Sequence, residues 1–358
     1  MRDEASSGQF LPEPGAKAPQ APLGNQPARI AKNPVTLSSS MGDSPSPGLC
    51  STGMGKTGIS FGDAEPSRSQ EDKPMGAEIT RFKKADPTTG MIAELRRNGA
   101  IIVEGLIDGG IIDRINAEID PHIQEADPEM EHINPFVGMF FGKETRHVAG
   151  MPGKSPTFAS EIIIEPTILE ICDDLLLPSC ARYQLNLGHL IDKGPGGPRQ
   201  MFHRDEDVWV HLPRPHDHVQ VASMIALEDF SEDIGATNIV PGSHEWARER
   251  QPEPQEVAIA EMPAGSAAIY LGSTLHAGGE NTTTDRWRRG LHASWICGWL
   301  RTEENNYLSC PPDKARELPR KAQEVLGYAA HDAIQSGGGY CGVVELQDPC
   351  GLMERGAL

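Results

Sequence analysis

The chain has 358 residues, a hydrophobic fraction of 38% and a formal net charge of -19 at neutral pH. An acidic surface repels the phosphates of nucleic acids and anionic membranes, and no basic cluster with interleaved aromatic residues offsets this charge. The sequence has no apolar run near the roughly 18 residues of a membrane-spanning helix, and its start, MRDEASSGQF, lacks a secretory pattern. We therefore expect a soluble cytoplasmic protein that binds neither nucleic acid nor membranes.

The first 74 residues differ in composition from the rest. They contain ten of the 30 prolines and only two aromatic residues, Phe10 and Phe61. A segment with so little apolar surface cannot offset the entropy lost on ordering. We predict a disordered tail over residues 1–76 and one folded domain over residues 77–358, a length that suits a single core. The seven cysteines form no CxxC pair and are expected to be reduced thiols.

The first part of the predicted domain has helical patterns. The segment MIAELRRN is predicted to form a helix that is capped by Thr88 or Thr89 and ends at Gly99, a residue suited to the left-handed C-terminal position. The short apolar run at 100–107 is predicted to be a strand. After it, Asp108 can cap a helix with isoleucines on one face.

The pattern then changes from helix to strand. A further apolar helical stretch is predicted from 158 toward 187, and five short strand-like segments follow from Ala181. Helices followed by regularly spaced strands, without βαβ alternation, predict an α+β or mainly β fold with a jelly-roll core flanked by helices. Residues 311–358 combine a helical segment, KARELPRKAQEVLGY, with glycines 337–339 and are expected to pack against this core. The five strand-like segments are ARYQLNLGHLI, HVQVASMIALEDF, TNIVPGS, SAAIYLGS and RGLHASWICGWL.

The segment MFHRDEDVW holds the strongest local signal for chemistry. His203 and Asp205 lie two residues apart, so on an extended segment both side chains leave the same face and can meet one metal ion. Fe(II) accepts an imidazole and a carboxylate, and a second histidine completes a facial triad. An HxD pattern by itself occurs often by chance, and alone it favours a solvated histidine and a structural aspartate.

A second segment, GSTLHAGGENTTTDRWRRGLHASW, supplies what the HxD pattern lacks. His276, 73 residues after His203, lies at the end of a strand-like run, and Arg288 or Arg289 opens the next run. A planar guanidinium can grip the carboxylate of a cosubstrate through two parallel hydrogen bonds, which a lysine does less well. The two segments together indicate a metal site with an anion-binding arginine.

These motifs resemble those of the phytanoyl-CoA dioxygenase family of Fe(II)- and 2-oxoglutarate-dependent oxygenases. The resemblance spans most of residues 88–300 and implies a double-stranded β-helix core of the cupin-like jelly-roll kind. The matching elements are His203 and Asp205, the turn GATNIVPGSH from Gly235 to His244, and the residues His276, Asn281, Arg288 and Gly290.

The resemblance also implies an active site that uses Fe(II), 2-oxoglutarate and O2. Arg288 is the implied anchor of 2-oxoglutarate, with Arg289 in reserve because the loop NTTTDRWRR is one residue longer than usual and Trp287 stands where proline is common. A small residue replaces Asp205 in halogenating relatives, so the aspartate here favours hydroxylation or a related C–H oxidation, with succinate and CO2 as coproducts. The implied metal ligands are His203, Asp205 and His276, and the implied contacts to cosubstrate or substrate are Gln184 and Asn186.

Two other functions fit part of the pattern. A non-catalytic cupin-like protein that binds a metal or ligand would keep the barrel, but it has no use for a buried arginine opposite the metal. A metal-dependent hydrolase or isomerase needs a general base, and only Glu206 and Asp207 are near, both expected to be solvated. The histidines of HLPRPHDH are expected in a polar loop over the pocket, and His189, His244 and His292 are expected to be structural. We therefore expect an oxygenase with a small-molecule substrate.

Overall fold

The structure is a computed structural model that describes residues 76–126, 135–331 and 340–358. The predicted tail lies outside the described residues except for Gly76, and so do the glycines at 337–339. The described residues all belong to one compact unit. Its described part consists of a mixed sheet, a smaller sheet and packed helices, which confirms the predicted α+β class. None of the described helices is long and apolar enough to cross a bilayer.

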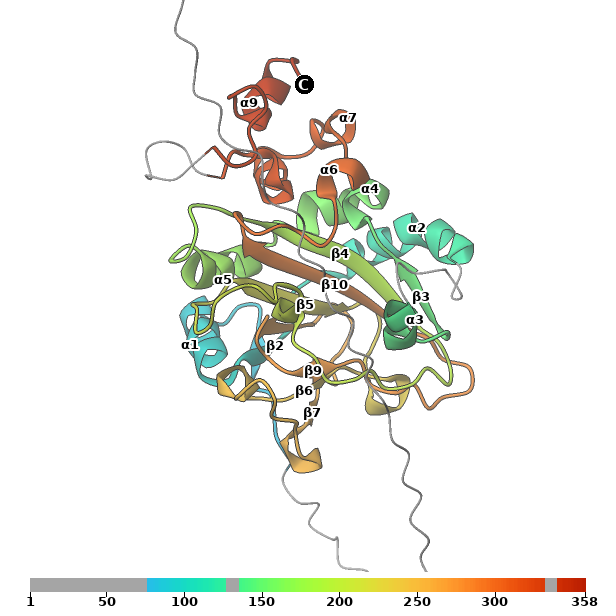
Figure 1. Cartoon of the computed structure of the whole chain (residues 1–358). Helices are drawn as coiled ribbons and strands as arrows, with labels where there is room; N and C mark the ends of the chain where they lie inside the picture. Colours follow the sequence, from blue (N-terminus) through green and yellow to red (C-terminus); the bar gives the residue numbers. More distant parts are fainter. Residues whose placement is uncertain (1–75, 127–134, 332–339) are drawn as a thin grey trace, which may run out of the picture. The chain divides into compact units, whose positions relative to one another are not determined.

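Seven strands form the large sheet in the order β1-β2-β8-β5-β10-β4-β3 (Figure 1). All neighbouring strands are antiparallel except β1 and β2, which are parallel. The pairing of β10 with β4 is the longest in the sheet, so this pair fixes the register of its neighbours. The strands are β1 (Arg81–Lys83), β2 (Ala100–Glu104), β3 (Thr145–Val148), β4 (Tyr183–Lys193), β5 (Gln220–Ala226), β8 (Ala267–Leu271) and β10 (Arg288–Cys297).

A second, smaller sheet has the order β7-β6-β9. Buried apolar side chains of both sheets pack in one cluster, for example Ile239 of β6 with Met224 of β5 and Tyr270 of β8. The two sheets therefore face each other across this cluster. The strands of the small sheet are β6 (Asn238–Ile239), β7 (Ala258–Ile259) and β9 (His276–Ala277).

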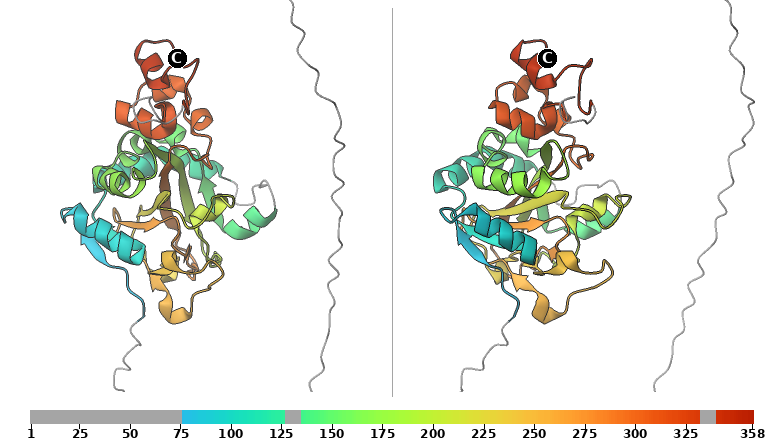
Figure 2. Two further views of the ribbon diagram at one scale, coloured as in Figure 1. Left: turned by 60° about the vertical axis from the view of Figure 1, so that its left-hand side comes forward. Right: turned by 90° about the vertical axis from the view of Figure 1, so that its left-hand side faces the viewer.

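The other face of the large sheet is covered by helices. Side chains alternate along each strand, so Ile101 and Val103 of β2 pack on the helix side while Ile102 packs toward the small sheet. The helices of the first half that supply buried side chains to this face are α1, α2, α4 and α5. Figure 2 shows the C-terminal helices (red) beside them, whereas α3 lies apart on the other side of the sheet. The helices are α1 (Thr88–Asn98), α2 (Gly109–Glu125), α3 (Pro135–Phe141), α4 (Met151–Lys154), α5 (Pro166–Leu176), α6 (Asn306–Ser309), α7 (Pro312–Ala315), α8 (Arg320–Gln323) and α9 (Pro349–Glu354).

The predicted helix ends are only partly confirmed. Helix α1 ends at Gly99, which adopts φ 75°, as predicted, but Pro87 occupies its N-cap position without a side-chain bond, so the threonine cap was wrong. The single helix predicted from 158 toward 187 was also wrong. A π-helical turn, Phe158–Ile162, precedes α5, and Pro166 opens α5 because proline is suited to a first helical turn and cannot continue a preceding one.

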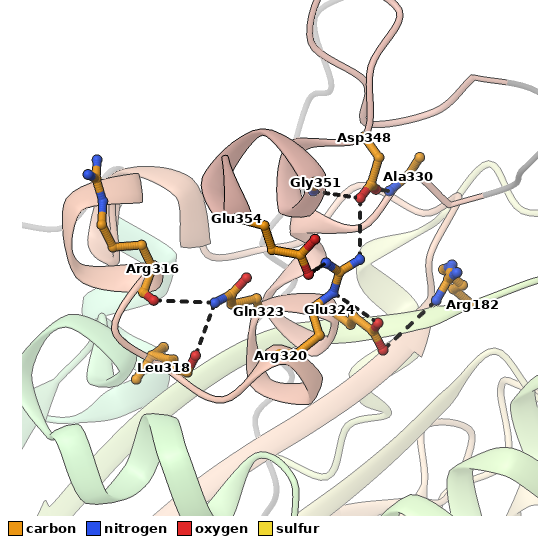
Figure 3. A network of polar contacts seen from close by, with 10 residues as sticks. All are labelled: Arg182, Arg316, Leu318, Arg320, Gln323, Glu324, Ala330, Asp348, Gly351 and Glu354. Atoms are coloured by element: carbon orange, nitrogen blue, oxygen red, sulfur yellow. Dashed lines mark hydrogen bonds and ion pairs between the residues drawn. The ribbon is translucent and has the colours of Figure 1, made fainter. Parts of the chain in front are cut away.

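The C-terminal segment is held by a polar network (Figure 3). Arg320 lies at its centre, with Nε 3.2 Å from Glu324 Oε1 and Nη2 3.4 Å from Asp348 Oδ2, and it also pairs with Glu354. Asp348 caps α9 by accepting from the backbone N–H of Gly351, and its other oxygen accepts from the N–H of Ala330 at 2.7 Å. The segment after Pro319 is thereby tied to α9.

Asp348→Ala is expected to destabilise the domain by about 1–2 kcal/mol, because it removes a helix cap and leaves the Ala330 N–H without its acceptor. Urea unfolding measures the change. The matched control is Asp285→Ala, which removes an exposed aspartate and is expected to change stability by less than about 0.5 kcal/mol. Equal stability of the two variants would contradict the capping role.

Candidate metal centre and active site

His203, Asp205 and His276 come together in the structure, as the sequence predicted. Each offers one ligand atom, and these three atoms lie within 4.8 Å of one another, a group that can hold a metal ion. Asp205 Oδ1 is 3.6 Å from His203 Nε2 and 3.3 Å from His276 Nε2. Two imidazoles and one carboxylate are a donor set typical of non-haem Fe(II).

The backbone holds the two histidines in fixed positions. His203 and His276 form an antiparallel bridge in which each backbone N–H donates to the other carbonyl at 3.0 Å. Residue 204 is extended, with φ -117° and ψ 131°, and Asp205 begins a short 3-10 helix, Asp205–Val208. The extended residue between them is what places His203 and Asp205 on one side.

The histidine rings are oriented so that Nε2 faces the group. His203 Nδ1 lies 3.0 Å from the carbonyl of Met201, and His276 Nδ1 lies 3.1 Å from the carbonyl of Thr274. A carbonyl accepts only from a protonated nitrogen, so each Nδ1 carries the proton and each Nε2 is left as a metal ligand. A metal-binding histidine is expected to donate its other ring N–H to such a carbonyl, which fixes the orientation of the ring.

Charge in the group also suits metal binding. Burial alone would raise the pKa of Asp205, but the imidazoles of His276 and His292 lower it well below its usual range. Burial in the cavity wall, then repulsion from His276, lowers the pKa of His203 to about 4. For His276, burial acts to lower the pKa, but Asp205 raises it above its usual value, so a divalent ion would have to displace a proton from this imidazole.

His292 belongs to this site, although the sequence analysis expected a structural role for it. Its Nε2 lies 3.4 Å from Asp205 Oδ2, and both atoms are buried without a hydrogen-bond partner among the described residues. The signal in the sequence was its spacing, since residues 288, 290 and 292 share one face of β10. His189, also expected to be structural, likewise lines the cavity, with its Nε2 2.9 Å from His147 Nδ1.

The sequence left open whether Arg288 or Arg289 faces the predicted site, and the structure places them on opposite faces of β10. Arg288 is 1% exposed and lines the cavity, and its Nε and Nη1 have no hydrogen-bond partner among the described residues. Arg289 points to the opposite face, where it donates to Asn116 and Asp120 of α2 at 3.0 and 2.8 Å. Alternation along β10 turns the first toward the cavity and the second toward the helices.

Gln184 and Asn186 lie outside this cavity wall. The Gln184 side chain donates to the carbonyls of Gly298 and Leu300 and lines a separate cavity of about 380 Å³. Gln184 is near the start of β4, whereas the residues of β4 that line the cavity lie in its second half. Because the strand is extended, Gln184 lies far from them. Asn186 is fully buried and exchanges two hydrogen bonds with Glu303, which does line the cavity.

The cavity at the His–Asp–His group has a volume of about 640 Å³. Its walls combine the polar group described above with apolar side chains, a composition that suits a small organic ligand. Two buried cationic residues, Lys193 and Arg288, also line the cavity, and only Arg288 was predicted for the site. The apolar side chains that line the cavity are Phe140, Phe141, Leu187, Ile191, Met201, Phe202, Val208 and Met224.

The two candidate general bases are held in ion pairs. Glu206 was expected to be solvated, but it is 3% exposed, and its Oε1 lies 2.6 Å from Arg214 Nη1. Asp207 Oδ1 lies 2.7 Å from Arg248 Nη2. Each carboxylate is thus engaged by an arginine side chain. Among the described residues, the His–Asp–His group is the only cluster of this kind that can hold a metal, so the neighbouring histidine loop forms no second one.

Comparison with known proteins identifies the class of enzyme. Dioxygenase swnH1 of Metarhizium robertsii is 32% identical over 295 residues, which cover 76% of this chain and 90% of that protein. Dioxygenase aneA of Aspergillus aculeatus is 31% identical and is covered to 80%, over 65% of this chain. A non-heme alpha ketoglutarate dependent carbocyclase from nogalamycin biosynthesis, SnoK, superposes with a TM-score of 0.49 at 18% identity, covering 65% of this chain and 93% of that one.

The sequence profile described as phytanoyl-CoA dioxygenase (PhyH) matches residues 95–290. The chain belongs to the phytanoyl-CoA dioxygenase family. The prediction of a 2-oxoglutarate-dependent dioxygenase is thereby confirmed, and the predicted cofactors, Fe(II), 2-oxoglutarate and O2, fit both this family and the His–Asp–His donor set.

The loop between His276 and Arg288 depends on Asn281, a fully buried residue of the matching motif. Its amide donates to the carbonyls of Lys193 at 3.1 Å and Arg286 at 2.8 Å. Asn281→Ala is expected to destabilise the domain by about 1–3 kcal/mol, because the buried hydrogen bond to the Lys193 carbonyl and the bond to the Arg286 carbonyl are both lost. Thermal unfolding against the matched control Thr284→Ala, an exposed residue of the same loop, tests this expectation. Indistinguishable melting temperatures would count against it.

Proposed function

We propose that this protein is an Fe(II)- and 2-oxoglutarate-dependent dioxygenase that hydroxylates a small-molecule metabolite, or otherwise oxidises one of its C–H bonds, with succinate and CO2 as coproducts. Residues 77–358 form the oxygenase domain in this proposal. The observation that carries it is the buried guanidinium of Arg288, whose Nε and Nη1 have no hydrogen-bond partner among the described residues, in the cavity that also holds His203, Asp205 and His276.

His203, Asp205 and His276 are the proposed iron ligands. Their Nε2 and carboxylate atoms converge, and the buried Asp205 Oδ2 has no hydrogen-bond partner among the described residues, as fits a carboxylate kept for a cation. Fe(II) bound by them supplies the chemistry in which O2 and the keto acid of 2-oxoglutarate react. The carboxylate of Asp205 takes the coordination position that a halide needs, which supports hydroxylation over halogenation.

Arg288 is the proposed anchor of 2-oxoglutarate. Burial lowers its pKa to about 10, so the guanidinium stays charged at neutral pH. Its planar fork of N–H donors matches a carboxylate, and a buried charge without a partner is unfavourable unless a ligand supplies one. Arg289, the reserve, is already bound to Asn116 and Asp120.

The cavity supports a small-molecule substrate. Its volume of about 640 Å³ falls within the usual range for a metabolite together with a cosubstrate. The apolar part of the wall includes Phe140, Phe202 and Val208, and it suits a largely apolar carbon skeleton whose C–H bond is to be oxidised. Excluding water from such a wall protects a reactive site from side reactions.

We also infer that the two sheets are the halves of a jelly roll, the double-stranded β-helix. In support, His276 is on β9 of the small sheet and Arg288 opens β10 of the large sheet, so the ligand groups converge from both sheets. A barrel mouth between two sheets is where this architecture holds ligands. A non-catalytic cupin-like protein would share this barrel, but Arg288 would then remain a buried charge without a function.

The test is anaerobic binding of Fe(II) and 2-oxoglutarate, followed by succinate release in air. The wild-type protein is expected to show an absorption band that requires both components. Arg288→Gln is expected to weaken 2-oxoglutarate binding at least about tenfold, since it removes a charge-assisted pair, while Arg289→Gln is the matched control and should keep its affinity. His203→Ala is expected to lose the metal-dependent band.

The outcomes separate the two functions. A protein that binds Fe(II) but gives no 2-oxoglutarate-dependent band, and releases no succinate with any metabolite of a screening set, is a binding protein. Equal affinities in Arg288→Gln and Arg289→Gln would remove the proposed anchor. Succinate release that rises when one metabolite is added identifies the substrate.

A further inference from the structure

A second buried cation stands beside Arg288. Lys193, the last residue of β4, is the cross-strand partner of Arg288, the first residue of β10. Residues directly opposite on antiparallel strands project to the same face with Cβ atoms ~4.5–5.5 Å apart. Both side chains are 1% exposed, and both line the cavity that holds the His–Asp–His group.

Among the described residues, neither cation forms an ion pair with a carboxylate. Asp192 contacts Arg146 and Arg289 instead, at 3.7 and 4.0 Å, and no ion pair reaches Lys193 or Arg288 in the part of the chain that the structure describes. The Lys193 ammonium donates to the carbonyls of Pro198 at 2.8 Å and Gly279 at 2.7 Å. An ammonium has three donors, so one N–H remains for a ligand.

Two buried like charges on facing positions are unfavourable in the free protein. Burial, then repulsion from Arg288, lowers the pKa of Lys193 to about 7. An anion between the two side chains would remove this repulsion and satisfy the free donors of both. The fold therefore keeps a site for one carboxylate with two cationic contacts.

We propose that Lys193 and Arg288 together bind the distal carboxylate of 2-oxoglutarate, and that Lys193 sets the preference for a dicarboxylate over a monocarboxylate 2-oxo acid. The inference rests on the proposed function, in which Arg288 is the anchor. Lys193 is then a binding residue for the cosubstrate, and its two carbonyl acceptors hold the ammonium in place.

Lys193→Met removes the charge and keeps the length of the side chain. In calorimetric titrations of the anaerobic Fe(II)-loaded protein at pH 6.5, this variant is expected to bind 2-oxoglutarate at least about tenfold more weakly, since it loses a charge-assisted hydrogen bond. Its affinity for 2-oxobutyrate, which lacks the distal carboxylate, is expected to change less than about twofold. The preference for 2-oxoglutarate over 2-oxobutyrate is therefore expected to fall by about the same factor as the affinity for 2-oxoglutarate.

The matched control is Lys84→Met. Lys84 also donates to a backbone carbonyl, that of Leu106, but does not line the cavity, and both affinities are expected to stay at the wild-type values. If Lys193→Met weakened the binding of both acids equally, Lys193 would have a structural role only. If both affinities were unchanged, Lys193 would have no role in binding. Either result overturns the inference while leaving 2-oxoglutarate binding by Arg288 intact. A wild-type protein that does not bind 2-oxoglutarate refutes the proposed function itself.

The pH dependence of the wild-type protein gives a second test that does not depend on a folded variant. The charged groups around the Lys193 ammonium are Arg288, with a pKa of about 10, and the exposed Glu144 and Glu280. Below pH 7 the free protein has Lys193 charged, and above it the ammonium must regain a proton when the dianion binds. Binding of the dianion thus raises the pKa of Lys193. The contribution of the charged ammonium to the affinity is therefore lost as the pH rises.

The dissociation constant for 2-oxoglutarate is therefore expected to rise between pH 7 and pH 8.5 by up to about tenfold per pH unit. Proton uptake should appear as a binding enthalpy that depends on the ionisation enthalpy of the buffer. Titration of 2-oxobutyrate is expected to show neither effect, because its binding does not engage the ammonium. A dissociation constant for 2-oxoglutarate that follows the same pH profile as that of 2-oxobutyrate would overturn the inference.

Discussion

The two backbone hydrogen bonds between His203 and His276 are the constraint on which the site depends. They join the segment after β4 to β9, two parts of the chain separated by 73 residues, and fix the distance between two of the three ligand side chains. Side chains alone could not do this, because a free imidazole has several rotamers. The carbonyls of Met201 and Thr274 then fix the ring orientation, so the site is preorganised by groups that take no part in chemistry.

The long pairing of β10 with β4 determines which charged and polar side chains face the cavity. Strand alternation puts Arg288 and His292 on the cavity face and Arg289 and Leu291 on the helix face. The pairing also brings Lys193 opposite Arg288, so the cations gather at one end of the strand pair. The His–Asp–His group and the two cations thereby share one pocket.

Sequence patterns predicted the strand segments and the three clustered ligands because these depend on local alternation and on motif spacing. Prediction was incomplete where a residue's place depends on strand pairing. Gln184 and Asn186 remain predicted contacts: both lie in the first half of β4, where Gln184 donates to the carbonyls of Gly298 and Leu300, whereas the second half of the strand lines the cavity. Lys193 and His292 carry no motif, and only the pairing of β4 with β10 and the packing around it bring them to the cavity. Glu206 was misjudged because its partner, Arg214, lies in a distant part of a loop.

The segment that carries Asp205 is anchored on both sides without any metal. Arg204 donates to the carbonyls of Ser273 and Ser243, and Glu206 pairs with Arg214. Structural zinc sites in small domains behave differently, since there the free energy of metal binding is largely spent on folding. In this protein the neighbours of Asp205 are held by contacts within the chain, so little of the free energy of metal binding would be needed to order this segment.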